Sequence, residues 1–329
     1  MSTFVRAALS DLAPERLGRT DYHEHLFHAS RLLPGDDLDD EDRSGQEAIQ
    51  LRSAGIDALV EATPIGLGRN PAAAARISAR SGLHVLLTTG AHREEHYDPG
   101  YWLLELTAGQ LASRFSGELH EALPADDCGP TSPPGLGPGG ASLRAGVIKA
   151  GIGYWSISAF ERRVLDAVAA AHARSGAPVM IHTEHGSAAL EVLKVLTAGG
   201  VAADRVALAH MDRNPDPGLH LEIASTGAYL GYDGMARSRA WPDSAVIECL
   251  VRVVADGGGN RLLLGGDVAR SSRFAAYGGM PGLVYLPSRF VTRLVKEAGQ
   301  EVVDQVLVRN PARLFAWAAP AATARLQTT

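Results

Sequence analysis

The sequence lacks three features that would point to a specialised environment. It has two cysteines among 329 residues, too few for a disulfide framework that would require an oxidising compartment. No stretch approaches the roughly 20 apolar residues of a membrane-spanning helix, and residues 1–18 contain no apolar run of signal-peptide length. Positive charge is not in excess, since 31 Lys and Arg against 37 Asp and Glu give a net charge of −6. We therefore expect a cytoplasmic globular protein that binds neither nucleic acid nor membranes.

Short apolar runs alternate with longer amphipathic stretches along the whole chain. Most runs are rich in Val, Ile and Leu with little alternation, which is typical of parallel strands covered on both faces. Helix signals lie between them. Ser158 and Glu161 form a capping box for a helix that ends at Gly176. Pro71 is placed to open a helix that ends near Gly82. The runs interpreted as strands are Arg19–His25, Ile56–Ala62, Leu83–Thr89, Ala145–Lys149, Pro178–His182, Val206–His210, Ala228–Tyr232 and Leu262–Asp267.

Eight strand–helix units in a chain of this length predict an α/β fold, a (β/α)8 TIM barrel that forms a single domain over residues 1–329. Residues 124–142 depart from the pattern, because nine of the twelve residues in 129–140 are Gly or Pro. Such a stretch cannot form a helix or bury much apolar surface, so we interpret residues 124–142 as a surface insertion between the third and fourth strands. Residues 318–329 are expected to form a flexible tail.

Polar side chains stand where the predicted strands end. His23 and His25 end the first strand, and residues two apart on a strand point to the same face. In a TIM barrel the carboxyl ends of all strands meet at one rim, where such enzymes keep their active sites. Each residue alone has an ordinary structural explanation, but their joint placement favours a metal site. The ends of the fourth, fifth, sixth and eighth strands carry Lys149, His182, His210 and Asp267 respectively.

Imidazoles and a carboxylate are ligands that zinc, manganese and cobalt all accept. Four histidines and one aspartate suffice for two divalent metal ions if another group bridges them. An ammonium is a poor bridge, but carboxylation of the Lys149 amine by carbon dioxide would give an anionic carbamate with one oxygen for each metal. Two metals about 3.5–4 Å apart would also share a water and lower its pKa, which supplies hydroxide near neutral pH.

These residues belong to a longer ordered series of motifs between about Thr20 and Phe315. In this order the motifs resemble the phosphotriesterase family of the amidohydrolase superfamily, which includes the phosphotriesterase-like lactonases. The series consists of TDYHEHL at 20–26, GLGRN at 66–70, TG at 89–90, IKAG at 148–151, HTE at 182–184, HMD at 210–212, GYD at 231–233, GD at 266–267 and NPAR at 310–313.

The resemblance implies a binuclear metal-dependent hydrolase. Zinc is the expected metal, with manganese and cobalt as alternatives. His23, His25 and Asp267 would hold the more buried metal, and His182 and His210 the more exposed one. Carboxylated Lys149 and a hydroxide would bridge them. In the family this hydroxide attacks a carbonyl or phosphoryl centre, and the aspartate accepts the proton, so Asp267 is also the predicted general base. A homodimer is a further expectation from the family.

The expected substrate is a small ester, with a lactone or carboxylic ester preferred and phosphotriester hydrolysis as a weak side activity. The chain departs from lactonase members where substrates are recognised: His92 stands in place of a tyrosine, and Gly234 in place of an arginine. Arginines in nearby loops suit carboxylates and phosphates. Hydrolysis of an amide or a phosphorylated ester is the alternative within the family. The predicted substrate contacts are His92, Arg237, Arg270, Arg273 and Tyr277.

Two readings from other classes remain open. A lysine at the end of a barrel strand can form a Schiff base, which would make Lys149 the centre of a metal-free aldolase. That reading leaves four histidines at neighbouring strand ends without a role. A binding protein with structural metals is the second alternative, although structural zinc sites are usually closed and four-coordinate. The ligand set here suits two metals and a shared water better.

Overall fold

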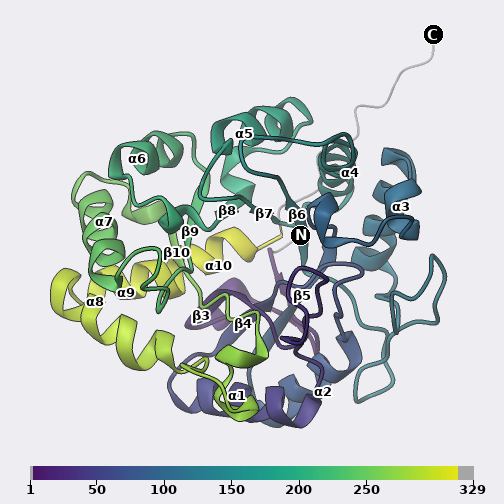
Figure 1. Cartoon of the computed structure of the whole chain (residues 1–329), viewed down its shortest axis with the longest axis horizontal. Coiled ribbons are helices and arrows are strands. Elements are labelled where there is room, and N and C mark those ends of the chain that lie inside the picture. Colours follow the sequence, from purple (N-terminus) through teal and green to yellow (C-terminus); the bar gives the residue numbers. More distant parts are fainter. Residues whose placement is uncertain (1–2, 318–329) are drawn as a thin grey trace.

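A computed structural model describes residues 3–317, and eight parallel strands form its centre (Figure 1). The strand order is β10-β9-β8-β7-β6-β5-β4-β3, so each strand pairs with its neighbour in the sequence. All eight predicted strands are present, which confirms the barrel. Their bounds are β3 Thr20–Glu24, β4 Ala58–Glu61, β5 His84–Gly90, β6 Val147–Gly151, β7 Val179–His182, β8 Val206–Ala209, β9 Tyr229–Tyr232 and β10 Leu262–Leu264.

The first and last barrel strands meet through side chains as well as backbone. The amide of Asp267 donates to the carbonyl of His23 at 2.9 Å, and the amide of Gly266 donates to Asp21 Oδ1 at 3.2 Å. A Cβ atom at Gly266 would overlap the Glu24 carboxylate, so this position needs glycine. The closure holds the end of β3 beside the segment after β10.

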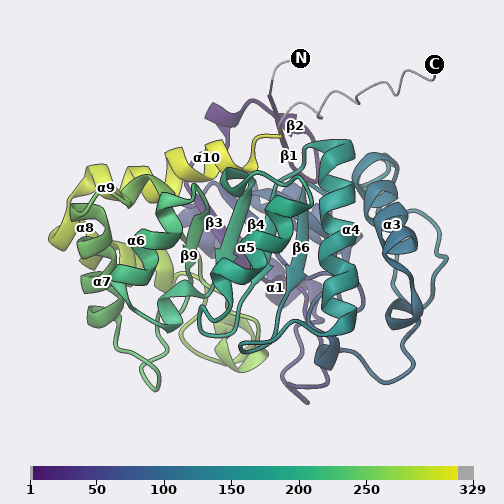
Figure 2. The same cartoon turned by 90° about the horizontal axis from the view of Figure 1, so that it is seen from above.

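Helices surround the barrel on its outside (Figures 1 and 2). The predicted capping box is confirmed: Ser158 Oγ accepts from the amide of Glu161 at 3.2 Å, and Gly176 ends the helix with a φ of 73°. The helix that begins at Pro71 stops before Gly82, which has a φ of 75°. The helices are α1 Glu41–Ser53, α2 Pro71–Ser81, α3 Ala108–His120, α4 Ala159–Ser175, α5 Ala189–Ala198, α6 Pro217–Ser225, α7 Asp243–Ala255, α8 Val291–Ala298, α9 Gln300–Asp304 and α10 Asn310–Phe315.

Apolar side chains pack in two layers, one inside the barrel and one between strands and helices. On β6, Val147 belongs to the inner layer and Ile148 to the outer one, as the alternation of a strand requires. A short hairpin of β1 (Val5–Arg6) and β2 (Asp11–Leu12) adds Val5 and Leu12 to the inner layer. Figure 2 shows this hairpin beyond one end of the barrel strands, next to α10.

The segment between α3 and β6 contains residues 124–142 and has no helix in those residues. Its Asp127 turns inward, where Oδ2 lies 2.7 Å from Arg69 Nε, and Arg69 in turn pairs with Glu118 at 2.8 Å. The predicted tail, residues 318–329, lies outside the described residues. Within residues 3–317, no helix is both long and apolar enough to cross a membrane.

Candidate metal centre

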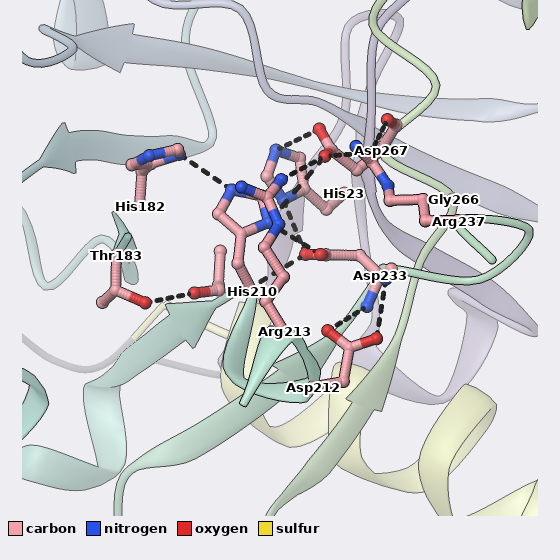
Figure 3. A network of polar contacts seen from close by, with 12 residues as sticks. His23, His182, Thr183, His210, Asp212, Arg213, Asp233, Arg237, Gly266 and Asp267 are labelled. Atoms are coloured by element: carbon pink, nitrogen blue, oxygen red, sulfur yellow. Dashed lines mark hydrogen bonds and ion pairs between the residues drawn. The ribbon is translucent and has the colours of Figure 1, made fainter. Parts of the chain in front are cut away.

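The barrel brings the predicted metal ligands together at the carboxyl ends of its strands, where Figure 3 shows His23, His182, His210 and Asp267. Asp267 Oδ1 lies 3.5 Å from His25 Nε2 and 3.7 Å from His23 Nε2. On the neighbouring strands, His210 Nε2 lies 2.8 Å from His182 Nδ1. The ligand atoms of His23, His25 and Asp267 all lie within 4.8 Å of one another, a spacing that suits one metal ion. The second pair of histidines offers two nitrogens for another.

The far ring nitrogens of three histidines have fixed partners. Thr63 Oγ1 lies 2.6 Å from His25 Nδ1, while Asp233 lies 3.1 Å from His23 Nδ1 and 2.7 Å from His210 Nδ1. Such contacts fix the ring orientation and leave the opposite nitrogen free to bind a metal. His23, His210 and Asp233 also meet the spacing for a metal. Because the Asp233 carboxylate already bonds the Nδ1 atoms of both histidines, we infer that Asp233 orients the ligands and does not bind a metal itself.

Burial keeps the candidate histidines neutral. It lowers the pKa of His23, His25 and His210 to about 4 in each case. Burial also lowers the pKa of His182 well below the usual value, and the nearby His92 adds to the effect. Only a neutral imidazole has a lone pair for a metal, so this environment suits ligation near neutral pH.

Lys149 is a buried amine in the fourth barrel strand. It is 1% exposed, and its Nζ contacts His23 Nε2 at 3.1 Å and Met180 Sδ at 3.1 Å. No carboxylate of residues 3–317 lies within ion-pair distance of this Nζ. Burial lowers the pKa of Lys149 to about 8, against the attraction of Asp267. A partly deprotonated amine beside the candidate ligand His23 fits carboxylation, because the neutral amine is the form that reacts with carbon dioxide.

Asp267 is held by two guanidinium groups that face its other oxygen. Arg213 Nη2 lies 2.9 Å from Asp267 Oδ2, and Arg237 pairs with the same oxygen while donating to the Asp267 carbonyl at 2.6 Å. Burial alone would raise the pKa of Asp267, but attraction to Arg237 and His210 outweighs it and keeps the pKa well below its usual range. Asp267 is therefore an anionic ligand, and Arg237 is engaged by it.

Two further groups that orient the site were not predicted from the sequence. Asp233 follows β9 and accepts a hydrogen bond from the Tyr22 hydroxyl in addition to its two histidine contacts. Asp212 supports it from the loop after β8, where Asp212 Oδ2 accepts from the Gly234 amide at 2.7 Å. Asp233 ends a barrel strand just as the candidate ligands do, so the same strand-end argument would have found it.

Glu184 was also missed, although it stands two residues after His182. Its Oε1 lies 2.7 Å from His182 Nε2 and 3.0 Å from Arg93 Nη2. This contact leaves His182 Nδ1 to face His210. The i, i+2 spacing was the available signal, but the strand ends at His182, so alternation along a strand did not predict the contact.

A cavity of about 330 Å³ lies over these ligands, and guanidinium groups are prominent in its wall. Among residues 3–317, the Arg273 guanidinium has no carboxylate within ion-pair distance, and its contact is the Met235 carbonyl at 3.3 Å. Burial lowers the pKa of Arg273, as does the neighbouring Arg237. A half-buried cation of this kind suits an anionic ligand. The arginines that line the cavity are Arg93, Arg213, Arg237, Arg270 and Arg273.

Four of the five predicted substrate contacts, His92, Arg237, Arg270 and Arg273, line this cavity, whereas Tyr277 does not. The Tyr277 hydroxyl accepts from the Asp40 amide at 2.8 Å and lies 3.0 Å from Ser44 Oγ. These contacts attach the loop after β10 to α1, so we leave Tyr277 out of the proposed substrate site.

An eight-stranded barrel with histidines, a lysine and an aspartate at its strand ends is typical of one class, the metal-dependent TIM-barrel hydrolases. Residues 4–315 match the sequence profile of the phosphotriesterase family. The chain belongs to the phosphotriesterase family, as the motifs predicted, and it is a hydrolase that acts on ester bonds.

Individual relatives agree with this assignment. The chain is 29% identical to a protein named phospho-furanose lactonase from Mycoplasmopsis synoviae, over 95% of this chain and 92% of that one. A lactonase from Listeria monocytogenes has a similar structure, with a TM-score of 0.86 and 30% identity over 96% of this chain and 100% of that one. The structure of the phosphotriesterase homology protein from Escherichia coli, complexed with phosphate in its active site, is also similar. Its TM-score is 0.80, with 29% identity over 91% of this chain and 99% of that one.

Proposed function

We propose that this protein is a metal-dependent lactonase whose substrate is a small lactone with a phosphate group. The observation that carries the substrate assignment is Arg273, a half-buried cation without a carboxylate partner in the described chain, in the wall of the cavity over the candidate ligands. Two relatives named for phospho-furanose lactones support it, as does the Escherichia coli relative with phosphate in its active site. A phosphorylated furanose lactone is therefore the proposed substrate.

Two divalent ions, zinc in the first instance, fit the donor set of the site. His23, His25 and Asp267 would hold one ion and His182 with His210 the other, while carboxylated Lys149 would contribute an oxygen to each. When bound, the metals polarise the lactone carbonyl and lower the pKa of a water. The buried neutral imidazoles and the anionic Asp267 are the protonation states that this role requires.

The residues of the chain itself position the ligands and the substrate. Asp233 fixes two imidazoles at once, and Thr63 fixes a third. Asp267 is the proposed proton acceptor; its Oδ1 faces His23 and His25, while its Oδ2 accepts from Arg213 and Arg237. These two guanidiniums favour the carboxylate over the acid, so a proton taken up by Asp267 would leave readily. Arg273, a neighbour of Arg237 in the cavity wall, would hold the phosphate.

The test compares two lactones that differ only in a phosphate, with initial rates followed by a pH indicator on zinc-loaded protein supplied with bicarbonate. Arg273→Gln should raise KM for the phosphorylated lactone by about tenfold to hundredfold, the worth of a charge-assisted hydrogen bond. KM for the neutral lactone should stay the same. Arg239→Gln is the matched control, because Arg239 is exposed and does not line the cavity.

An unchanged KM in Arg273→Gln would contradict the phosphate assignment. If neither lactone is hydrolysed although the metals are bound, amides and phosphorylated esters are the next substrates. Weak phosphotriester hydrolysis is expected beside the main activity. Trapping of a carbonyl substrate on Lys149 by borohydride would instead support the aldolase reading.

We also propose that the enzyme acts in the cytoplasm on a small molecule, as a homodimer. Its cysteines, Cys128 and Cys249, are free thiols, as expected for a reducing compartment. The net charge of −6 gives no basis for a nucleic-acid or anionic membrane partner.

A further inference from the structure

A second cavity of about 700 Å³ adjoins the one over the candidate ligands and shares Glu184 and Arg213 with it. Three aromatic side chains line it: Tyr154 is 64% exposed, Trp155 65% and Trp241 44%. Among the large hydrophobic side chains of residues 3–317 that are exposed, these three are the aromatic ones, and the others are aliphatic or Met. Exposed aromatic surface gathered in one hollow is typical of a binding site.

The local backbone holds these side chains in place. Trp155 has a φ of 48°, in a region that bulky residues seldom adopt, and its amide donates to Ser187 Oγ at 3.1 Å. Such strain concentrates at functional sites. Trp241 Nε1 donates to the Arg213 carbonyl at 3.1 Å, which fixes the indole beside the shared wall. The ring of Tyr154 stands edge-on to His185, with 6.3 Å between the ring centres.

The charged groups of this cavity already have partners. Glu184 contacts His182 and Arg93, and Arg213 contacts Asp267. The side chains that remain for a ligand include the three aromatic ones, beside His185, Asn214 and Leu219, and the aromatic faces favour an uncharged flat ring that can stack on them. The shared wall places such a ring in the cavity that adjoins the candidate ligands.

We propose that the second cavity is a substrate subsite for an aromatic ring, carried on the alcohol side of an ester whose acyl group lies over the metal ligands. This extends the substrate range beyond small lactones. It rests on the proposed ester hydrolysis for the identity of the ligand as substrate, but ring binding can be measured without any turnover.

The first experiment is a ligand-observed NMR titration of the protein with benzyl alcohol, with propanol as the matched aliphatic probe. Benzyl alcohol should bind and propanol should not bind measurably. Trp155→Ala and Tyr154→Ala should each weaken the affinity for benzyl alcohol by about twofold to tenfold, which is the contribution of one aromatic pair. Ile49→Ala, on α1 and 45% exposed, is the control and should bind as the native protein does. Equal binding in all variants, or none in the native protein, overturns the proposal.

The second experiment measures kcat/KM for benzyl and propyl esters of one acid, whose leaving alcohols are similar in basicity. The native enzyme should prefer the benzyl ester, and Trp155→Ala should reduce the ratio by the factor found for binding. If Trp155→Ala binds benzyl alcohol more weakly but keeps the native ratio of kcat/KM for the two esters, the cavity is not a substrate subsite. If no ester is hydrolysed, the proposed function fails, while the NMR titration still decides whether the cavity binds a ring.

Discussion

At the residue scale, the candidate site depends on the residues that orient the histidine ligands as much as on the ligands themselves. A buried imidazole can rotate, and its free nitrogen faces a metal only if the other nitrogen is held. Asp233 does this for His23 and His210, and Thr63 does it for His25. His182 differs, because its partner Glu184 borders both cavities and is 18% exposed at its side chain.

Glu184→Gln should therefore weaken the metal site formed by His182 and His210. The amide is a weaker acceptor for the imidazole N–H, so we expect a loss of about tenfold to hundredfold in metal affinity, measured by competition with a chromophoric chelator. Glu95→Gln is the matched control, because Glu95 pairs with the same Arg93 but does not touch His182. Equal affinity in the two variants would exclude an orienting role for Glu184.

At the scale of elements, the segment after α3 is tied to the loop before α2 by a buried ion pair. The side chain of Arg69 is 3% exposed and that of Asp127 is 8% exposed, and Asp127 Oδ2 also accepts from the Gly66 amide at 3.0 Å. The same loop contributes Leu67 to the cavity wall. Residues 124–142 thus support one wall of the cavity through a single carboxylate.

Asp127→Asn should lower the free energy of unfolding by about 3 kcal/mol at pH 7, because it leaves Arg69 with one carboxylate fewer. Burial would raise the pKa of Asp127, but Arg69 outweighs it and holds the pKa below its usual range. A folded pKa below the unfolded value of about 3.9 contributes stability above that pH and loses it as the pH falls through the folded pKa.

The difference between native protein and Asp127→Asn should therefore shrink as the pH falls below about 4, which urea unfolding at several pH values would measure. Asp126→Asn is the control, since the Asp126 carboxylate accepts a local hydrogen bond, from the Cys128 amide at 3.0 Å. A difference that stays constant from pH 7 to pH 3 would contradict the ionic origin of the stabilisation.

At the scale of the whole molecule, the candidate metal ligands come from β3, β6 and β7 and from the residues that follow β3, β8 and β10, so bound metals would connect strands around most of the barrel. A ligand that binds only the folded state stabilises it by about 4 kcal/mol when present at 1,000 times its Kd. Removal of the metals should therefore lower the melting temperature of a chain of this size by about 5–10 °C.

This is measured by thermal unfolding before and after chelation, with metal content checked by elemental analysis. His23→Asn, which removes one ligand, should show a smaller shift on chelation than the native protein. If elemental analysis shows that all metal is gone and the melting temperature is unchanged, the metals do not stabilise the barrel by linking its strands.

The positions of the strands and of the candidate ligands could be predicted because both depend on local order. Several apolar runs of strand length end in polar residues, and this pattern places His23, Lys149, His182, His210 and Asp267 at one rim once the barrel is assumed. The same local logic predicted the caps at Ser158 and Gly176. Metal binding by these residues stays a prediction.

What the sequence by itself determined is thus the barrel, the family and the set of groups at its rim, because periodicity, strand-end residues and motif order are properties of neighbours along the chain. Only the tertiary structure decided which of these groups are already engaged. Arg237 pairs with Asp267, Tyr277 bonds to Asp40, and Arg273 keeps no carboxylate partner in the described chain. Such pairings join loops far apart in sequence, and their distances depend on how the whole barrel closes.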